Sequence, residues 1–267
     1  MTFHGPHSGM RVRSVFLSDI HLGTLECQAE RLLDFLESVQ TECLYLVGDI
    51  VDLWSLQGGL YWPQTHAAVL RLIFAKARAG TRVVFVPGNH DERLREFCGH
   101  QFGNIEVLRD CVHETGDGRR MLVLHGDEFD GHVKCGRWMS ALGTHLYDLL
   151  LRWGYRLNKA RRFLGYGHWS LVTWLKGRVG NVRRHVELFE RAAASEARRR
   201  GLDGVICGHI HRPSVAMLEG VLYCNDGDWV EHCTALVESH QGELQLWDWP
   251  ERPVRELRRT REWSQAA

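Results

Sequence analysis

Five short stretches of the sequence place acidic, imidazole or amide side chains directly after a run of apolar residues. The most concentrated is VVFVPGNHDERL, residues 83–94, where the apolar run leads into Gly88, Asn89, His90 and Asp91. A turn needs glycine and accepts asparagine, but it does not need an imidazole and a carboxylate as well. The other four stretches end in Asp19 and His21, in Asp49 and Asp52, in His125 and Asp127, and in His209 and His211.

Together these stretches offer seven side chains that bind metal ions well. They are Asp19, His21, Asp49, Asn89, His125, His209 and His211. Carboxylates, imidazoles and one amide oxygen suit a first-row divalent ion such as Mn, Fe or Zn, and do not suit calcium. Seven ligands exceed what one such ion takes from a protein, so two ions sharing a bridging carboxylate would account for them. Each motif alone is weak, but their joint occurrence predicts a two-metal centre.

The apolar runs before these clusters are short and uninterrupted, which is typical of strands buried on both faces. Helix-like segments at residues 27–40 and 63–80 separate the first three runs, and Gly80 is a candidate C-cap for the second. This alternation predicts βαβ units and a largely parallel sheet. Ligands of α/β sheets lie beyond the carboxyl ends of the strands, where all five clusters fall. After residue 211, shorter strands with tight turns predict an antiparallel sheet that completes a two-sheet sandwich.

The composition of the 267-residue chain is ordinary for a globular protein, with 44% hydrophobic and 25% charged residues. The formal net charge is zero, so nothing global predicts a nucleic-acid partner. The eight cysteines form no CxxC pair and several lie in apolar runs, which indicates free thiols in a reducing compartment. No signal-peptide pattern and no apolar run of ~18 residues is present. We therefore expect a cytoplasmic protein.

Residues 134–200 differ from the rest of the chain. They contain fifteen Lys and Arg, four Asp and Glu, and four tryptophans, in a helical pattern. This predicts a basic lid inserted over the fourth and fifth strand loops, suited to an anionic or amphiphilic partner and to peripheral contact with an anionic membrane. The alternative is a helical pair that covers a hydrophobic core. The domain is expected to span residues 11–249, followed by a tail at 250–267.

The five motifs resemble the signature of calcineurin-like metallophosphoesterases, over residues 13–213. The matching residues are Asp19-x-His21, Gly48-Asp49-x-x-Asp52, Gly88-Asn89-His90-Asp91, His125 and Gly208-His209-x-His211. The resemblance implies a four-layer αββα sandwich. It also implies that one ion is held by Asp19, His21, Asp49 and His211, and the other by Asp49, Asn89, His125 and His209.

Hydrolysis of a phosphate ester or diphosphate follows from this resemblance. Two divalent ions, manganese being the first expectation, would activate a water molecule and bind the phosphoryl oxygens. His90 is expected to contact the phosphate or to protonate the leaving oxygen, and Asp91 is expected to orient its imidazole.

Further stretches, including HGDEFD and NDGDWVE, resemble the UDP-diacylglucosamine diphosphatase branch of the family, which belongs to lipid A synthesis. That resemblance implies hydrolysis of UDP-2,3-diacylglucosamine to UMP and a lipid-sugar 1-phosphate. The substrate contacts it suggests are His90, Asp130, Lys176, His209, Asp228 and Trp229. One position departs from that branch, because His90 stands where its members carry arginine.

Two other functions fit the sequence. The first is a broad-specificity phosphodiesterase or phosphatase that acts on nucleotides or other phosphoesters. The second is a catalytically inactive scaffold, although such proteins usually lose a metal ligand and all seven are present here. Nucleic acid is the least expected partner, because the net basic character of the chain is confined to the predicted lid. The sequence leaves the oligomeric state open.

Overall fold

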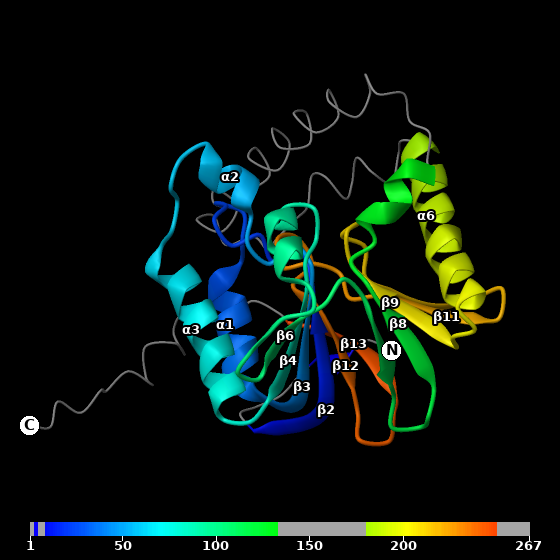
Figure 1. Cartoon of the computed structure of the whole chain (residues 1–267), viewed down its shortest axis with the longest axis horizontal. Helices are drawn as coiled ribbons and strands as arrows, with labels where there is room; N and C mark the ends of the chain where they lie inside the picture. Colours follow the sequence, from blue (N-terminus) through cyan, green and yellow to red (C-terminus); the bar gives the residue numbers. More distant parts are fainter. Residues whose placement is uncertain (1–2, 5–8, 133–179, 250–267) are drawn as a thin grey trace, which may run out of the picture.

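The computed structural model describes residues 3–4, 9–132 and 180–249 of the chain. The predicted tail, the predicted substrate contact Lys176 and most of the predicted lid therefore lie outside the described residues. Two β-sheets pack face to face, and helices cover both outer faces (Figure 1). The expected four-layer αββα sandwich is confirmed.

The larger sheet has eight strands, and its centre is parallel. In spatial order the strands are β1 (Phe3–His4), β13 (Leu244–Asp248), β12 (Thr234–Glu238), β2 (Met10–Leu17), β3 (Val39–Val47), β4 (Arg82–Val86), β6 (Ile105–Val107) and β5 (Gln101–Phe102). Strands β2, β3 and β4 pair in parallel, as the βαβ pattern predicts. Strand β12 joins β2 in the antiparallel sense.

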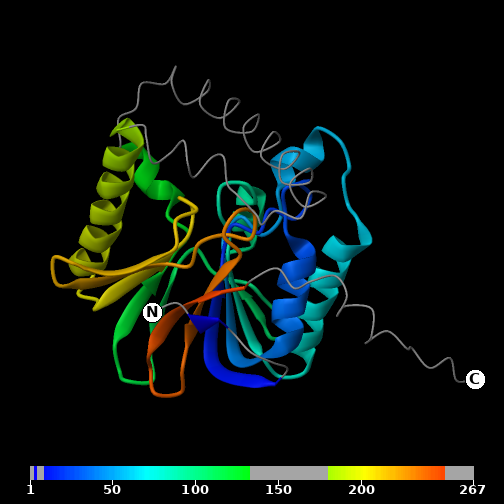
Figure 2. The same cartoon turned by 180° about the vertical axis from the view of Figure 1, so that it is seen from behind.

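The smaller sheet has five strands. In spatial order they are β10 (Ser214–Leu218), β11 (Val221–Asn225), β9 (Gly204–Cys207), β8 (Arg120–Val123) and β7 (Cys111–Glu114). The expectation of one antiparallel sheet after residue 211 is wrong. The hairpin β10–β11 extends the smaller sheet, while β12–β13 crosses back and extends the larger one, beside β2 in Figure 2. Strand patterns give the pairing of neighbours in a hairpin, but they do not say which sheet receives it.

Hydrophobic residues form a core layer between the larger sheet and its helices, a second between the two sheets, and a third between the smaller sheet and its helix. Alternating side chains of the central strands of the larger sheet supply the first two. In β2, Val15 and Leu17 face the helices α1 (Ala29–Ser38) and α3 (Gln64–Arg78), whereas Phe16 lies in the layer between the sheets. Strand β3 begins directly after α1, so residues 39 and 40 are strand and not helix as expected. Helix α3 ends near Gly80, whose φ of +108° and N–H bond to the Ala77 carbonyl fit the predicted C-cap.

Helix α6 (Gly180–Arg199) covers the outer face of the smaller sheet. Its Phe189, Ala193 and Ala197 are fully buried in one cluster with Val205 and Tyr223 of that sheet. The last twenty residues of the predicted basic insertion thus form a layer of the sandwich. None of the helices in the described part of the chain is long and apolar enough to cross a membrane.

A buried polar network joins the two sheets. Glu238 on β12 lies 2.9 Å from His113 Nε2 on β7, and His113 Nδ1 lies 2.9 Å from the Tyr45 hydroxyl on β3. Arg13 Nη1 donates to the other Glu238 oxygen at 2.7 Å, and the Gly116 N–H donates to that oxygen at 2.8 Å. Burial raises the pKa of Glu238, but hydrogen bonds from His113, Ser14 and the Gly116 N–H outweigh it and lower the pKa to about 2. The network therefore requires an ionised carboxylate between the sheets.

Replacing Glu238 with glutamine tests this network. The folded pKa of about 2 lies below the ordinary 4.5, so the stabilisation is complete above pH 4.5 and is lost as the pH falls through 2. We expect Glu238→Gln to lower the free energy of unfolding by about 2–3 kcal/mol at pH 7, and by clearly less at pH 3. Urea titrations at both pH values measure this. Exposed Glu243→Gln, in the β12–β13 turn, is the control, and a loss for Glu238→Gln that is equal at both pH values would contradict the assignment.

Candidate metal centre

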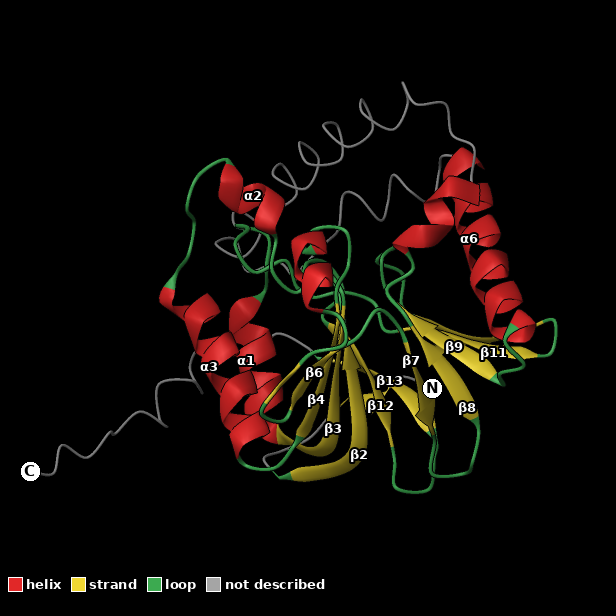
Figure 3. Ribbon diagram, viewed as in Figure 1, coloured by secondary structure: helices red, strands yellow, loops and turns green. Residues whose placement is uncertain are grey.

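The loops that follow β2, β3, β4, β8 and β9 meet at one edge of the sandwich. Short helices follow three of these strands along that edge in Figure 3: α2 (Leu53–Gln57), η1 (Glu92–Phe97) and η2 (Asp127–His132). Three groups of residues lie there, and within each group the potential ligand atoms are no more than 4.8 Å apart. They are Asp19, His21 and His211; His21, Asp49 and His90; and Asp49, His125 and His209. Six of the seven sequence-predicted ligands are thus brought together, and the seventh, Asn89, precedes His90.

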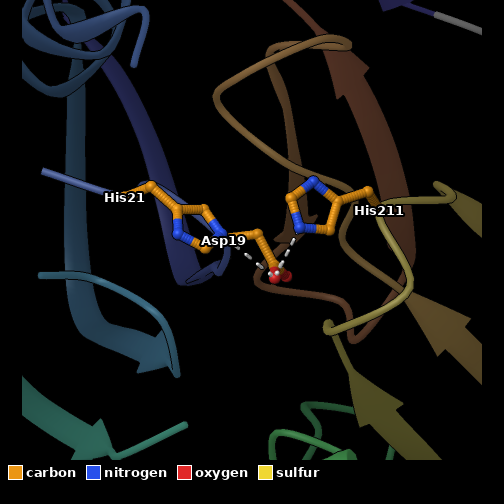
Figure 4. A group of neighbouring side chains, drawn as sticks. All are labelled: Asp19, His21 and His211. Atoms are coloured by element: carbon orange, nitrogen blue, oxygen red, sulfur yellow. Dashed lines mark ion pairs between the residues drawn. The ribbon is translucent and has the colours of Figure 1, made fainter. Parts of the chain in front are cut away.

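The Asp19 carboxylate lies between two imidazoles that come from distant parts of the chain (Figure 4). Its Oδ1 is 3.2 Å from His211 Nε2 and 4.0 Å from His21 Nε2. Its Oδ2 accepts hydrogen bonds from the Ser18 hydroxyl at 2.5 Å and from the His209 N–H at 2.8 Å. One oxygen is therefore fixed by the protein, and the other remains directed at the imidazoles.

The Asp49 carboxylate has the same division of roles. Its Oδ1 accepts the His90 N–H at 2.8 Å. Its Oδ2 lies 3.4 Å from His125 Nε2, 3.9 Å from His21 Nε2 and 4.0 Å from His90 Nε2. Because this oxygen faces ligands of both predicted ions, Asp49 has the position expected of a bridging carboxylate.

Hydrogen bonds at the far nitrogens fix how the imidazoles face the centre. His125 Nδ1 lies 2.8 Å from the Val47 carbonyl oxygen, and His21 Nδ1 lies 3.1 Å from Asp52 Oδ2. Since both partners only accept, each Nδ1 carries a proton, and Nε2 is the nitrogen that can bind an ion once it gives up its own proton. His209 differs, because its Nε2 lies 3.0 Å from Asp130 Oδ2. Asp130, expected to contact substrate, therefore holds a predicted metal ligand.

Unpartnered buried atoms test whether the site fits a cation. Asp19 Oδ1, His21 Nε2, Asn89 Oδ1 and His125 Nε2 are buried, and none makes a hydrogen bond to any residue that the structure describes. Buried polar atoms nearly always have a partner, and a bound ion is one explanation for those without one. All four are good donors to a first-row divalent ion, so the residues fit the group.

Charge–charge interactions in this buried space shift the pKa values of the ligands strongly. Burial disfavours a charged imidazole, but the hydrogen bond to Asp52 and the charges of Asp49 and Asp19 raise the pKa of His21 to about 9. Burial similarly opposes a charge on His125, and the neighbouring Asp49 carboxylate raises the pKa of that imidazole well above its usual value. Protons thus balance the carboxylates in the free protein, and a cation that binds must displace them.

The backbone at the site is strained. Five predicted ligands have positive φ angles between 50° and 68°: Asp19, His21, Asp49, His209 and His211. Only two other non-glycine residues in the described part of the chain share this conformation. Such residues cost of order 1–3 kcal/mol each and persist where the surroundings fix them, often at functional sites.

Three glycines of the motifs leave space for ligands. A Cβ on Gly88 would overlap Asp49 Oδ1 and lie 2.8 Å from the His125 ring, and one on Gly208 would overlap Asp19 Oδ2. Gly48 approaches the His125 ring in the same way and also has a φ of +83°. Gly88 has an ordinary φ, so lack of space excludes a side chain there.

The predicted role of Asp91 is wrong. Its buried carboxylate accepts the N–H groups of Gly88 at 2.6 Å and Ile50 at 2.8 Å, which fixes the backbone of two ligand loops. The carboxylate beside His90 is Asp52, whose Oδ2 lies 2.9 Å from His90 Nδ1. Asp52 also contacts His21, so one carboxylate holds both imidazoles.

The predicted substrate contacts Asp228 and Trp229 are wrong as well, because both side chains are fully buried. Trp229 packs in the core against Phe35, with ring centroids 5.4 Å apart. The Asp228 carboxylate accepts the Val230 N–H at 2.8 Å and lies 2.5 Å from His232 Nδ1. It supports the turn beside His211, 3.9 Å away, and does not reach solvent.

Sequence reasoning missed two further supports of the site. The Ser18 hydroxyl lies 2.6 Å from the buried carboxyl of Asp226, and burial raises the pKa of that carboxyl well above its usual value. Arg95 donates to both oxygens of Asp127, at 2.7 and 2.8 Å, and links the loop after β4 to η2 of the other sheet. Asp127 follows a recognised motif, but nothing local in the sequence identifies Arg95 as its partner.

Replacing Gly88 with alanine tests whether Asp49 and His125 need to lie close to the backbone of this loop. The added methyl group would displace Asp49 and His125, so we expect fewer bound metal ions per chain and a loss of about 1–3 kcal/mol in stability. Metal analysis after dialysis and urea unfolding measure the two effects. Gly58→Ala is the matched control, because a Cβ there meets a backbone oxygen at an ordinary 3.5 Å. Full metal content in Gly88→Ala would show that the loop accommodates a side chain.

Comparisons with known proteins agree with this geometry. The sequence model described as Calcineurin-like phosphoesterase matches residues 12–213. The UDP-2,3-diacylglucosamine hydrolase of Xanthomonas campestris pv. campestris (strain B100) is 26% identical over an alignment of 235 residues, which covers 84% of this chain and 94% of the relative. That of Xanthomonas axonopodis pv. citri (strain 306) is 29% identical over 250 residues, with the same coverage.

The solved structures that this chain resembles are more distant in sequence. A hypothetical protein from Pyrococcus horikoshii OT3 is 11% identical, with a TM-score of 0.47 over 93% of this chain and 91% of that chain. An archaeal phosphodiesterase is 13% identical, with a TM-score of 0.41 over 88% of this chain and 98% of that chain.

The family match covers all five loops from which the ligand cluster is built. With the ligand cluster, its unpartnered donor atoms and the αββα sandwich, it leads to one conclusion: the chain belongs to the calcineurin-like phosphoesterase family and is a hydrolase of phosphate esters that depends on divalent metal ions.

Proposed function

We propose that the seven ligands hold two ions and that the protein hydrolyses UDP-2,3-diacylglucosamine to UMP and a lipid-sugar 1-phosphate. One ion is assigned to Asp19, His21, Asp49 and His211, and the other to Asp49, Asn89, His125 and His209. The observation that carries the two-ion assignment is the position of Asp49 Oδ2 between His125 on one side and His21 on the other. Manganese is the proposed metal, and the same ligands accept Fe or Zn.

Within this proposal His90 is the residue that meets the substrate. Its side chain is 26% exposed, and its Nε2 points toward Asp49 from 4.0 Å while its Nδ1 lies against Asp52. A protonated imidazole in this position can donate its Nε2–H to a phosphoryl oxygen or to the leaving oxygen. The bound ions would supply an activated water as nucleophile and would neutralise charge on the phosphoryl group.

The identity of the substrate rests on the named relatives and on the sequence between the motifs. The relatives that carry the name UDP-2,3-diacylglucosamine hydrolase align over 84% of this chain. The basic character of residues 134–200 and their four tryptophans suit a diphosphate attached to acyl chains. A peripheral position on the inner face of the membrane and a cytoplasmic location are part of the same proposal.

His90 itself favours a second candidate, a broad-specificity phosphodiesterase. Cleavage of a diphosphate releases a phosphate oxygen, which needs little help from an acid because the phosphate is already a stable anion. An alkoxide or phenolate needs a proton much more. An imidazole next to Asp52 therefore suits ester substrates better than it suits a nucleotide diphosphate.

A direct assay separates the two candidates. The manganese-loaded protein is given UDP-2,3-diacylglucosamine in detergent micelles and, separately, bis(p-nitrophenyl) phosphate. The proposal predicts UMP release with a kcat/KM at least about 100-fold above that for the aryl diester, since remote binding energy raises kcat/KM for the correct substrate. Asp49→Asn should abolish both activities. A higher kcat/KM for the aryl diester would favour the second candidate.

Replacing His90 with alanine tests its assignment as an acid. We expect kcat for diphenyl phosphate to fall by ~10²–10⁴-fold, and kcat for bis(p-nitrophenyl) phosphate to fall much less, because p-nitrophenolate leaves without protonation. The bound metal should remain, since His90 is not an assigned ligand. Metal analysis alongside the kinetics is needed, because loss of metal from the variant would make His90 a ligand, and equal losses on both esters would exclude an acid.

A further inference from the structure

Three consecutive residues at the start of α2 contact His90. Asp52 is the N-cap of this helix: its Oδ1 accepts the Ser55 N–H at 2.7 Å, and its Oδ2 lies 2.9 Å from His90 Nδ1. The Leu53 N–H donates to the His90 carbonyl oxygen at 3.1 Å. The Trp54 indole lies over the His90 ring, with ring centroids 4.3 Å apart and an interplanar angle of 37°. The helix therefore holds the backbone, one nitrogen and one face of the same residue.

These contacts remove different freedoms of the imidazole. Asp52 fixes the direction of Nδ1, but a single contact at one atom leaves the ring able to tilt about it. Trp54 blocks that tilt on one side. On another side the His21 ring meets His90 nearly at right angles, 86°, with centroids 4.7 Å apart. In contact with both rings, His90 has its Nε2 on the side of the metal cluster, 4.0 Å from Asp49.

Packing in a core does not account for Trp54. None of the five residues of α2 is buried, and the Trp54 side chain is 46% exposed. The helix packs on the loop after β2 through Leu56. The side chain of Leu56 covers Gly23 so closely that a Cβ added to this glycine would lie only 3.0 Å from it. The indole is thus placed beside the site without belonging to any of the three hydrophobic clusters of the described residues.

We propose that Trp54 is a positioning residue for His90, which keeps the imidazole at the angle from which it reaches the leaving oxygen. This inference rests on the proposed role of His90 as an acid. Trp54 acts through His90 and does not itself need to touch the substrate.

The test compares two esters of nearly the same shape. Diphenyl phosphate releases phenolate, which needs a proton, and bis(p-nitrophenyl) phosphate releases a better leaving group. We expect Trp54→Ala to lower kcat for diphenyl phosphate by about 10–100-fold, since a small misplacement of a catalytic group has effects of this size. For bis(p-nitrophenyl) phosphate the loss should stay within about 3-fold, with metal content unchanged.

Three further variants serve as controls for this test. Trp54→Phe keeps a flat ring over His90 and should restore most of the activity, whereas Trp54→Leu keeps the apolar bulk without the ring and should not. Phe74→Ala removes an aromatic side chain of similar exposure, 54%, from α3 and is the control for a general effect on stability.

A double-mutant cycle decides between positioning and any independent role. In a His90→Ala background, Trp54→Ala should cause no further loss, because the group it positions is gone. If Trp54→Ala lowers kcat in the His90→Ala background as much as it does in the wild-type protein, the inference is overturned and the acid role of His90 stays intact. A rise in KM with unchanged kcat would also overturn it, since that result marks a substrate contact. If His90→Ala keeps wild-type activity on both esters, the acid role and this inference fail together.

Discussion

The Asp49 carboxylate is the group on which the arrangement of the site depends, because it contacts residues of both sheets. Its Oδ1 is held by the His90 N–H, from the larger sheet, and its Oδ2 faces His125, from the smaller one. Two buried carboxylates next to several imidazoles are stable only if positive charge balances them. The two carboxylates raise the pKa of both His21 and His125, and a bound cation would take the place of the protons that this favours. The site is thus prepared electrostatically for cations.

The structure holds this carboxylate in place at the expense of backbone strain. Five predicted ligands adopt left-handed backbone angles, and Gly48, Gly88 and Gly208 leave no room for a Cβ. Strain of this kind persists because the flanking strands are buried on both faces and cannot relax. Residues without any role in chemistry, such as Asp91 with its bonds to Gly88 and Ile50, stabilise the loops that carry the ligands.

The sequence was sufficient to predict the four layers, the parallel centre of the larger sheet and the convergence of six of the seven proposed ligands, because buried strands and the polar residues after them leave local patterns. The sequence was insufficient where the role of a residue depends on the direction in which its side chain leaves a loop. Asp91 adjoins His90 in the chain, yet its carboxylate turns to the backbone and Asp52, 38 positions earlier, takes its place. Trp229 follows a motif-like segment but is buried, and only the packing of β12 and α1 reveals why.

The closing strands of the chain connect back to its beginning. The family match ends at residue 213, yet β12 pairs with β2 through Leu236 and Phe16, and Ser18 contacts Asp226, 208 residues away. Contacts so distant in sequence are slow to form. All seven proposed ligands precede β12 in the chain, yet β2, the strand that leads into Asp19, is paired on both sides only when β12 has joined it. The final geometry of the proposed metal site therefore depends on a part of the chain that contributes no ligand to it.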